Sequence, residues 1–173
     1  MSDGTTLLFG LPGVRVERVE RRADGTRVVH VATAEPTAAA CPACGVVSTS
    51  VKGRVTTSPH DIPYGEKRIV LRWNKTRWRC REDYCTRSSF TETIAQVPAR
   101  ARTTQRLRTQ IGTAIGDAAR SVTEVATAHG VSWPTAHRAF VAHAEAVLTD
   151  PEPAPGAGHR RDPPRQAQVG MVR

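Results

Sequence analysis

The sequence predicts an α+β fold in which a small β-rich module precedes an all-α module and a disordered C-terminal tail. All four cysteines fall in two close pairs, and alternating runs typical of strands lie around and between them. From residue 103 the apolar residues follow the period of a helix, and past residue 150 almost no apolar residue remains. With 173 residues and only 5% aromatic content, the chain suits two small modules better than one large core.

Residues 1–38 predict a β-hairpin segment. Val14, Val16 and Val19 partly alternate with charged residues, and a second apolar run covers residues 28–31. Between the runs stands an Asp-Gly dipeptide, a signal for a tight turn because glycine tolerates positive φ. We expect this hairpin to be structural and to pack beside the module that follows.

Residues 39–98 hold the two cysteine pairs, one of spacing C-x2-C and one of spacing C-x4-C. Four thiolates in two tight loops form a tetrahedral sulfur site that suits Zn²⁺. Two disulfides are the main alternative, but no signal-peptide segment precedes the cysteines and disulfides are rare in the cytosol. A redox role for the C-x-x-C motif is disfavoured, because the sequence has no βαβ pattern around it. We therefore assign a structural Zn²⁺, with no open position for catalysis, to Cys41, Cys44, Cys80 and Cys85.

Three strands are predicted between the cysteine pairs, at residues 51–57, 68–73 and 75–80, which makes this module a zinc ribbon. Trp73 and Trp78 fall on the apolar faces of these strands, and we expect both in the core. His60 precedes the second strand and is interpreted as a loop residue, because four cysteines already complete a tetrahedral metal site.

The net charge of +9 comes from 22 arginines and three lysines against 16 acidic residues, and it is concentrated in the middle of the chain. Residues 45–92 carry +5 and residues 93–120 carry +4. Such a patch attracts polyphosphate backbones, although a merely solvated surface is the alternative. The candidates for phosphate contact are one arginine face of the ribbon, with Arg72, Arg77 and Arg79, and a cluster at the first helix, with Arg100, Arg102, Arg106 and Arg108.

Residues 100–150 predict three helices. The first has an apolar stripe from Leu107 to Ala118 and begins at a threonine cap, Thr103 or Thr104. The helix dipole disfavours cations at the N-terminal end of this helix, so helix stability does not explain the arginines there. Contact with a phosphate would explain them. The second helix starts at the capping box formed by Ser121 and Glu124.

The second and third helices have the pattern of a helix-turn-helix. Gly130 allows a sharp turn, and the helix that starts at Ser132 accepts Pro134 in its first turn. An ordinary helical hairpin is the alternative, and His129 stands where an apolar residue is more usual. Covering the core of the helices is an equal alternative to DNA contact for Trp133. The surface left for a DNA groove consists of Ser132, Trp133, Thr135, His137 and Arg138, of which the last is the best candidate for a base or phosphate contact.

The order of these motifs resembles the N-terminal half of bacterial insertion-sequence transposases of the ISL3 family, over about residues 7–150. The resemblance is carried by CPACG at 41–45, RWRC at 77–80 and GVSWPT at 130–135. It implies that the zinc ribbon and the helix-turn-helix, at residues 121–146, bind the terminal inverted repeats of the element. In that family a separate RNase-H-like domain with an Asp-Asp-Glu triad cuts and joins DNA.

Residues 151–173 are rich in Pro, Gly, Arg and Gln, and we expect them to be disordered. A back-translation of this tail, shifted by one nucleotide, reads like the segment through which the family enters its catalytic domain. We interpret the tail as a frameshift product. The chain is then expected to be a non-enzymatic binder of double-stranded DNA, without membrane or small-molecule substrate, cytoplasmic and nucleoid-associated in a bacterium. Full-length transposase or a second copy are further expected partners. The alternatives are a protein-interaction module, a regulatory short product that inhibits transposition, and an inert product.

Overall fold

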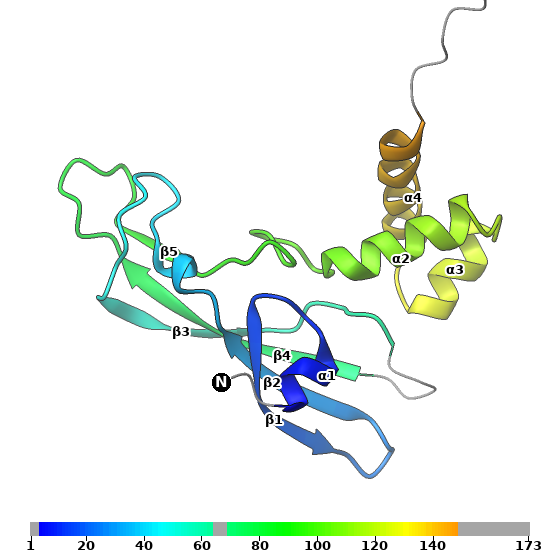
Figure 1. The fold of residues 1–173 in the computed structure, drawn as a ribbon, viewed down its shortest axis with the longest axis horizontal. Helices are drawn as coiled ribbons and strands as arrows, with labels where there is room; N and C mark the ends of the chain where they lie inside the picture. Colours follow the sequence, from blue (N-terminus) through cyan, green and yellow to red (C-terminus); the bar gives the residue numbers. More distant parts are fainter. Residues whose placement is uncertain (1–3, 64–68, 149–173) are drawn as a thin grey trace, which may run out of the picture.

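The computed structural model describes residues 4–63 and 69–148 and places a five-stranded sheet at one end of an elongated molecule and three helices at the other (Figure 1). The expected α+β class is confirmed. Arg68, taken as the start of a strand, and the tail 151–173 lie outside the described residues. The elements are α1 (Gly4–Phe9), β1 (Val14–Arg21), β2 (Arg27–Thr33), a 3-10 turn (Pro36–Ala39), β3 (Val51–Thr57), β4 (Ile69–Arg79), β5 (Ser89–Thr91), α2 (Gln105–Gly116), α3 (Val122–His129) and α4 (Trp133–Val147).

The expected hairpin is present as β1 and β2, which pair antiparallel. Gly25 in the turn has a φ of 81°, a conformation that glycine adopts without steric cost. The amide of Thr26 donates to the Asp24 carboxylate at 2.9 Å, and this bond holds the pKa of Asp24 below its usual value. The Asp-Gly dipeptide therefore sets the geometry of the turn in this hairpin.

The hairpin is hydrogen-bonded into the same sheet as the ribbon strands. β2 pairs with β4 in parallel, from Arg27 opposite Ile69 to Ala32 opposite Asn74. The strand order is β1-β2-β4-β3, and β5 also pairs with β4. β4 is thus the central strand, and the core of the sheet forms around it. That core consists of Leu11, Val14, Val16, Val29, Val31, Leu71, Trp73, Ile94 and Val97.

The prediction of two strands at residues 68–73 and 75–80 is wrong, because β4 runs without a break from Ile69 to Arg79. Side chains alternate through Asn74, so Arg72 projects from one face of the sheet and Arg77 and Arg79 from the other. The single arginine face that we expected is therefore not formed. β3, by contrast, has the bounds that the sequence predicted.

The two ribbon tryptophans differ in burial. Trp73 is 1% exposed at the centre of the core, as expected, whereas Trp78 is only half-buried. The indole N–H of Trp78 donates to the buried carboxylate of Glu92 at 3.1 Å. The same carboxylate accepts from the Thr33 hydroxyl and the Thr76 amide, each at 2.8 Å. Glu92 thereby ties β2, β4 and the segment after β5 together.

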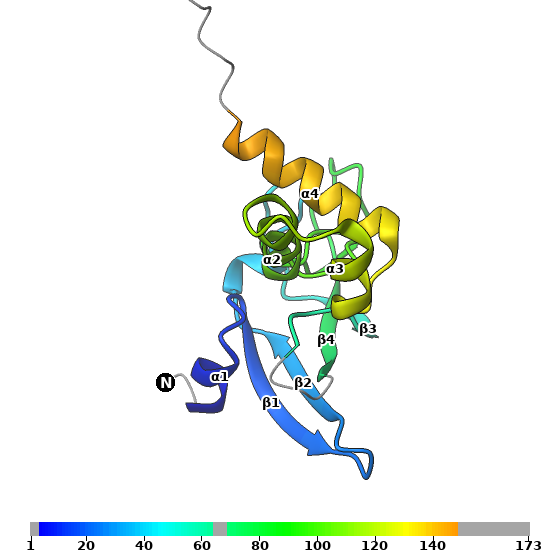
Figure 2. The same cartoon turned by 90° about the vertical axis from the view of Figure 1, so that its right-hand side faces the viewer.

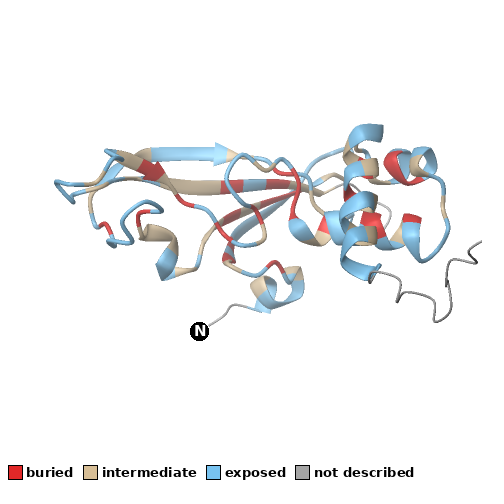
Figure 3. Ribbon diagram, turned by 90° about the horizontal axis from the view of Figure 1, so that it is seen from above, coloured by how far each residue is buried: buried red, intermediate tan, exposed pale blue. Residues whose placement is uncertain are grey.

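The three predicted helices form, with α4 lying across α2 and α3 (Figure 2). Thr104 caps α2 by accepting from the Leu107 amide, and Ser121 caps α3 by accepting from the Glu124 amide. Gly130, with a φ of 63°, ends α3 in the left-handed conformation. The helices enclose a second core, separate from that of the sheet (Figure 3), made of Leu107, Ile111, Ile115, Val125, Ala126, Ala136 and Ala139. Within the described residues, no helix is both long and apolar enough to cross a membrane.

Candidate metal centre and nucleic-acid interface

The four cysteines converge at the end of the sheet far from the helices, where the loop after the 3-10 turn meets the loop between β4 and β5 (Figure 1). Their sulfur atoms all lie within 4.8 Å of one another, and two pairs lie 3.7 and 3.6 Å apart. A tetrahedron with Zn–S bonds of ~2.3 Å has edges of about 3.8 Å, so the donor set fits Zn²⁺. A disulfide bond is only about 2.0 Å long, and all four cysteines are free. Among the described residues this is the one cluster of potential metal ligands.

Short hydrogen bonds shape the two loops around the sulfur atoms. The amide of Gly45 donates to the Cys41 carbonyl at 2.8 Å, and Gly45 has a φ of 76° that closes the first loop. In the second loop the amide of Arg87 donates to the Cys85 sulfur at 3.4 Å. The Ser48 hydroxyl donates to the carbonyl of Arg79, the last residue of β4, at 2.6 Å, which joins the first loop to the strand before Cys80. The loops are therefore held together by the sheet as well as by their sulfur atoms.

The thiols of the cluster differ in their hydrogen-bonding surroundings. Backbone N–H groups of Ala43 and Cys44 donate to the Cys41 sulfur and lower the pKa of that thiol to about 6. For Cys44 the Val46 amide acts in the same direction, but burial and the neighbouring thiols outweigh it and raise the pKa to about 12. A structural zinc binds thiolates, so capture of the ion displaces protons. The chemistry that Zn²⁺ supplies here is cross-linking of the two loops.

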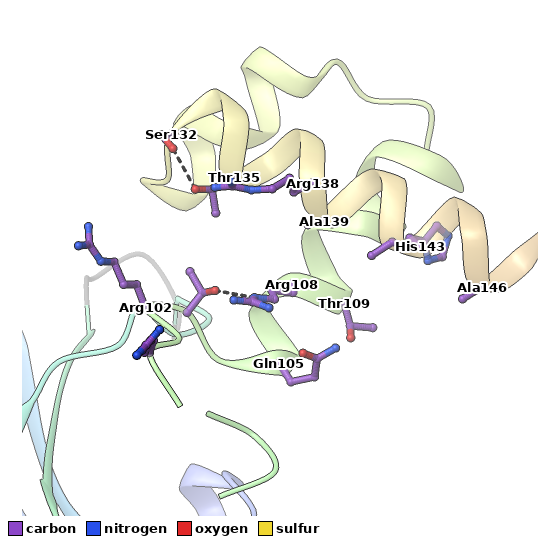
Figure 4. A pocket seen from close by; sticks show the side chains of 13 residues that line it. Arg102, Gln105, Arg108, Thr109, Ser132, Thr135, Arg138, Ala139, His143 and Ala146 are labelled. Atoms are coloured by element: carbon purple, nitrogen blue, oxygen red, sulfur yellow. Dashed lines mark hydrogen bonds between the residues drawn. The ribbon is translucent and has the colours of Figure 1, made fainter. Parts of the chain in front are cut away.

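At the helical end, a groove lies between α4 and the N-terminal part of α2 with the segment that leads into it. We call it the α2–α4 groove. Its volume is about 770 Å³. Figure 4 shows Arg102 and Arg108 on one side, with Ser132, Thr135 and Arg138 on the other. The lining residues are Arg100, Arg102, Thr103, Gln105, Arg108, Thr109, Ser132, Thr135, Arg138, Ala139, Ala142, His143 and Ala146.

Six of the twelve residues expected to contact DNA line this groove, and they come from both walls. Arg100, Arg102 and Arg108 stand on the α2 side, and Ser132, Thr135 and Arg138 on the α4 side. All four arginines among them are exposed, and no acidic residue lines the groove. Arg108 is held in place by its Nε, which donates to the Thr103 hydroxyl at 2.8 Å. The result is a positively charged groove.

Trp133 and His137 of the expected set lie outside the α2–α4 groove. Their rings are stacked, with centroids 4.8 Å apart and planes 10° from parallel. Trp133 is 50% exposed, so it does not close the core as a lid would. The expected contact residues of α4 are thus divided between two flanks of the helix, one charged and one aromatic.

Arg106 requires a correction, because its guanidinium points into the protein. Nε donates to one oxygen of Asp61 at 2.7 Å, and one terminal nitrogen pairs with the other oxygen. The second terminal nitrogen donates to the Phe9 carbonyl at 2.9 Å, and the Phe9 ring lies 4.9 Å from the guanidinium carbon. The Asp61 side chain is 1% exposed and that of Arg106 19%. Three of the five N–H donors of this guanidinium are thus engaged inside the protein, which disfavours Arg106 as a phosphate contact.

The ribbon arginines are exposed and do not line the α2–α4 groove. Arg77 contacts the Ser89 hydroxyl at 3.4 Å, and Arg79 donates to the Val51 carbonyl at 2.7 Å. Arg72 stands on the other face of the sheet, as described above. The structure therefore separates the expected basic residues into a ribbon group and a groove group.

Several residues that shape the site were missed by sequence reasoning. His60 lies in the loop between β3 and β4, as expected, and sequence reasoning missed only its isolated parallel bridge to Thr103, in the segment before α2. Asp61 was not singled out, and the only available signal was an acidic residue in a basic stretch. Gly112 and Gly116 face His143 at close range, and their spacing of four residues on one helix was the signal that could have revealed this contact.

Comparison with known protein families gives two matches. Residues 37–85 match the family model described as the zinc-finger of transposase IS204/IS1001/IS1096/IS1165. Residues 92–144 match the helix-turn-helix domain of transposase family ISL3. The first interval contains all four cysteines, and the second contains α2, α3 and most of α4. Searches of curated proteins and of solved structures returned no match.

Proposed function

The chain belongs to the ISL3 family of transposases, and from this premise we propose that it binds double-stranded DNA at the terminal inverted repeats of an insertion sequence. Both matched domains are DNA-binding parts of such transposases. We propose binding, without strand cleavage, as the activity of this chain. Zn²⁺ held by the four cysteines serves the fold of the ribbon.

The observation that carries the proposal is the α2–α4 groove. A helix-turn-helix presents its second helix to the major groove, and here that helix is α4. Thr135 and Arg138 lie on its groove side, and the exposed arginines Arg102 and Arg108 face them from the α2 side (Figure 4). A guanidinium on the reading helix can pair with guanine, while those on the opposite wall can hold phosphate. The arrangement supports base reading and backbone grip in one docking event.

The ribbon supplies a second set of basic side chains. Arg77 and Arg79 project from one face of β4 near the metal end, and Lys52 of β3 shares the Ser89 hydroxyl with Arg77. We propose that this set contacts the DNA backbone outside the segment read by α4. Such contacts add affinity and carry no sequence information of their own.

A gel-shift titration tests the proposal. The zinc-loaded chain is titrated against a duplex that carries the inverted repeat next to its gene and against a shuffled duplex of equal length, at two salt concentrations. We expect tighter binding of the repeat, by at least about 10³-fold at physiological salt, and weakening of both as salt rises. Equal affinity for the two duplexes contradicts recognition of the repeat. Nicking of the repeat by the purified chain with Mg²⁺ contradicts binding as its sole activity.

A further inference from the structure

The helix-turn-helix is fastened to the sheet by a short segment of the ribbon, residues 59–62 between β3 and β4. The amide of His60 donates to the Arg102 carbonyl at 2.8 Å, and the Thr104 amide donates to the His60 carbonyl at 2.9 Å. Ile62 packs against the helical core. The segment therefore holds the backbone of the arginine wall of the α2–α4 groove.

Asp61 forms the centre of this fastening. Besides Arg106, its carboxylate accepts from the hydroxyl of Thr104, the N-cap of α2, at 2.7 Å. Arg106 in turn reaches the carbonyl of Phe9 at the end of α1. One buried carboxylate thus joins the ribbon, the helical domain and the N-terminal segment. Removal of one partner of a buried ion pair strongly destabilises a protein, because the other charge then stays buried and unpaired.

The sheet extends away from this fastening. β4 has eleven residues, which at ~3.3 Å per residue span about 36 Å. One end of the sheet faces the helices and the other holds the cysteines (Figure 1). One turn of B-DNA is about 34 Å long. The central strand of the sheet thus covers about the same length as one turn of a duplex.

We infer that Asp61 is a positioning residue that fixes the helix-turn-helix to the ribbon, so that the protein reads a two-part DNA site with one permitted spacing of about one helical turn. The inference rests on the proposed function. It assigns to the chain a geometric selectivity for spacing, in addition to any preference for bases.

The first experiment measures the coupling without DNA. Backbone ¹⁵N relaxation of the zinc-loaded chain reports the tumbling of the sheet and of the helices separately. We expect one common rotational diffusion tensor for the wild type and for Glu124→Gln, a control that removes an exposed carboxylate paired with Arg120 inside the helical domain. We expect faster tumbling of the helices relative to the sheet in Asp61→Ala, or in the milder Asp61→Asn if the alanine variant does not fold. Unchanged common tumbling in a folded variant overturns the inference.

The second experiment measures spacing. The wild type selects its site from a random duplex library, hydroxyl-radical footprinting locates the two protected segments, and five base pairs are inserted between them. We expect the insertion to weaken wild-type and Glu124→Gln binding by at least about tenfold, because both segments no longer engage together, and to weaken Asp61→Asn binding by less than about threefold. A residue that only stabilised the fold would lower affinity for every spacing alike. Equal sensitivity of Asp61→Asn and wild type, or a single undivided footprint, overturns the inference. Failure of the wild type to select any site contradicts the proposed function instead, and the relaxation experiment then still tests the coupling.

Discussion

Gly112 of α2 lies directly against His143 of α4, so closely that a Cβ on the glycine would stand 2.6 Å from the Cβ of the histidine. The carbonyl of Ala139 would be only 2.9 Å away. Neither atom is the end of a flexible side chain, so neither can turn aside. One turn later, a Cβ on Gly116 would meet the His143 ring at 2.7 Å, and the same ring contacts the Asp117 carboxylate at 2.8 Å. This close crossing sets the distance between the two walls of the α2–α4 groove.

We expect Gly112→Ala to destabilise the helical domain by about 1–3 kcal/mol, because the added methyl forces α2 and α4 apart. The sign of the stability change is informative. In an unstrained helix alanine is favoured over glycine by about 1 kcal/mol, so the same substitution would there stabilise the protein. Urea unfolding monitored by circular dichroism measures the change. Thr113→Ala, at the neighbouring exposed position, is the control and should stay within about 0.5 kcal/mol of the wild type. A more stable Gly112→Ala variant would show that the helices can separate freely.

Replacement of Cys80 by serine should abolish stoichiometric zinc binding, because a structural site needs all four sulfur ligands. The loops at the metal end should then lose their order, while the helical domain, which has its own core, keeps its circular-dichroism signal. Elemental analysis and protection of amides from hydrogen exchange provide the readouts. Tyr84→Ala is the matched control, since Tyr84 lies between the ligands in sequence and is 96% exposed. One bound zinc per chain in the serine variant would refute the four-sulfur assignment.

Glu92→Gln should lower the free energy of unfolding by about 1–3 kcal/mol. The carboxylate accepts three hydrogen bonds from donors on two strands, β2 and β4, and an amide presents its own N–H₂ to at least one of those donors. Thermal unfolding of the zinc-loaded chain gives the size of the effect. Glu82→Gln, an exposed carboxylate in the second cysteine loop, serves for comparison and should be close to neutral. A neutral effect at both positions would mean that the buried network contributes nothing to stability.

Two groove arginines should affect DNA binding differently. Arg138→Ala on α4 should cost about 1–3 kcal/mol at the base pair it reads and relax the preference there. Arg102→Ala on the opposite wall should weaken cognate and random duplexes alike and reduce the salt slope by about 1. Titrations of both duplexes over a salt series distinguish the two patterns. If both variants show the same pattern, the proposed division between base reading and backbone grip is wrong.

Trp133→Ala tests the aromatic flank of α4. Because Trp133 is half exposed and stacks on the His137 ring, its loss should change stability by less than about 1 kcal/mol. If this flank also contacts DNA, affinity for the repeat should fall, and the indole fluorescence should change when DNA is added to the wild type. Unaltered affinity would show that this aromatic flank of α4 does not contact DNA.

Features that depend on local sequence were predictable. The Asp-Gly turn, the caps at Thr104 and Ser121, the left-handed Gly130 and the bounds of β3 all follow from chemistry within a few residues. The cysteine pairs were predictable for a similar reason, because ligand spacing is itself a local constraint. Geometry confirms that all four sulfurs meet.

Features that depend on distant partners were not predictable. The parallel pairing of β2 with β4 joins residues about 42 positions apart, as in Val29 opposite Leu71, and neither strand encodes its partner. The two predicted strands leave out residue 74, but Asn74 lies within β4, where its side chain contacts Thr56 and Glu17. Arg106 is indistinguishable from Arg102 and Arg108 in sequence. Only the fold brings Asp61 beneath it and turns its guanidinium inward.

The parallel pairing of β2 with β4 also bears on how the chain is made. The hairpin leaves the ribosome before β4, so one edge of β2 stays without a partner until β4 has been synthesised, a delay of a few seconds at ~5–20 residues per second. An unpaired apolar edge of this kind is open to wrong partners, including other nascent chains. Metal capture is equally late, because the last sulfur ligand follows the end of β4. Yield from an expression host should therefore depend on zinc supply and on chaperone protection during this interval.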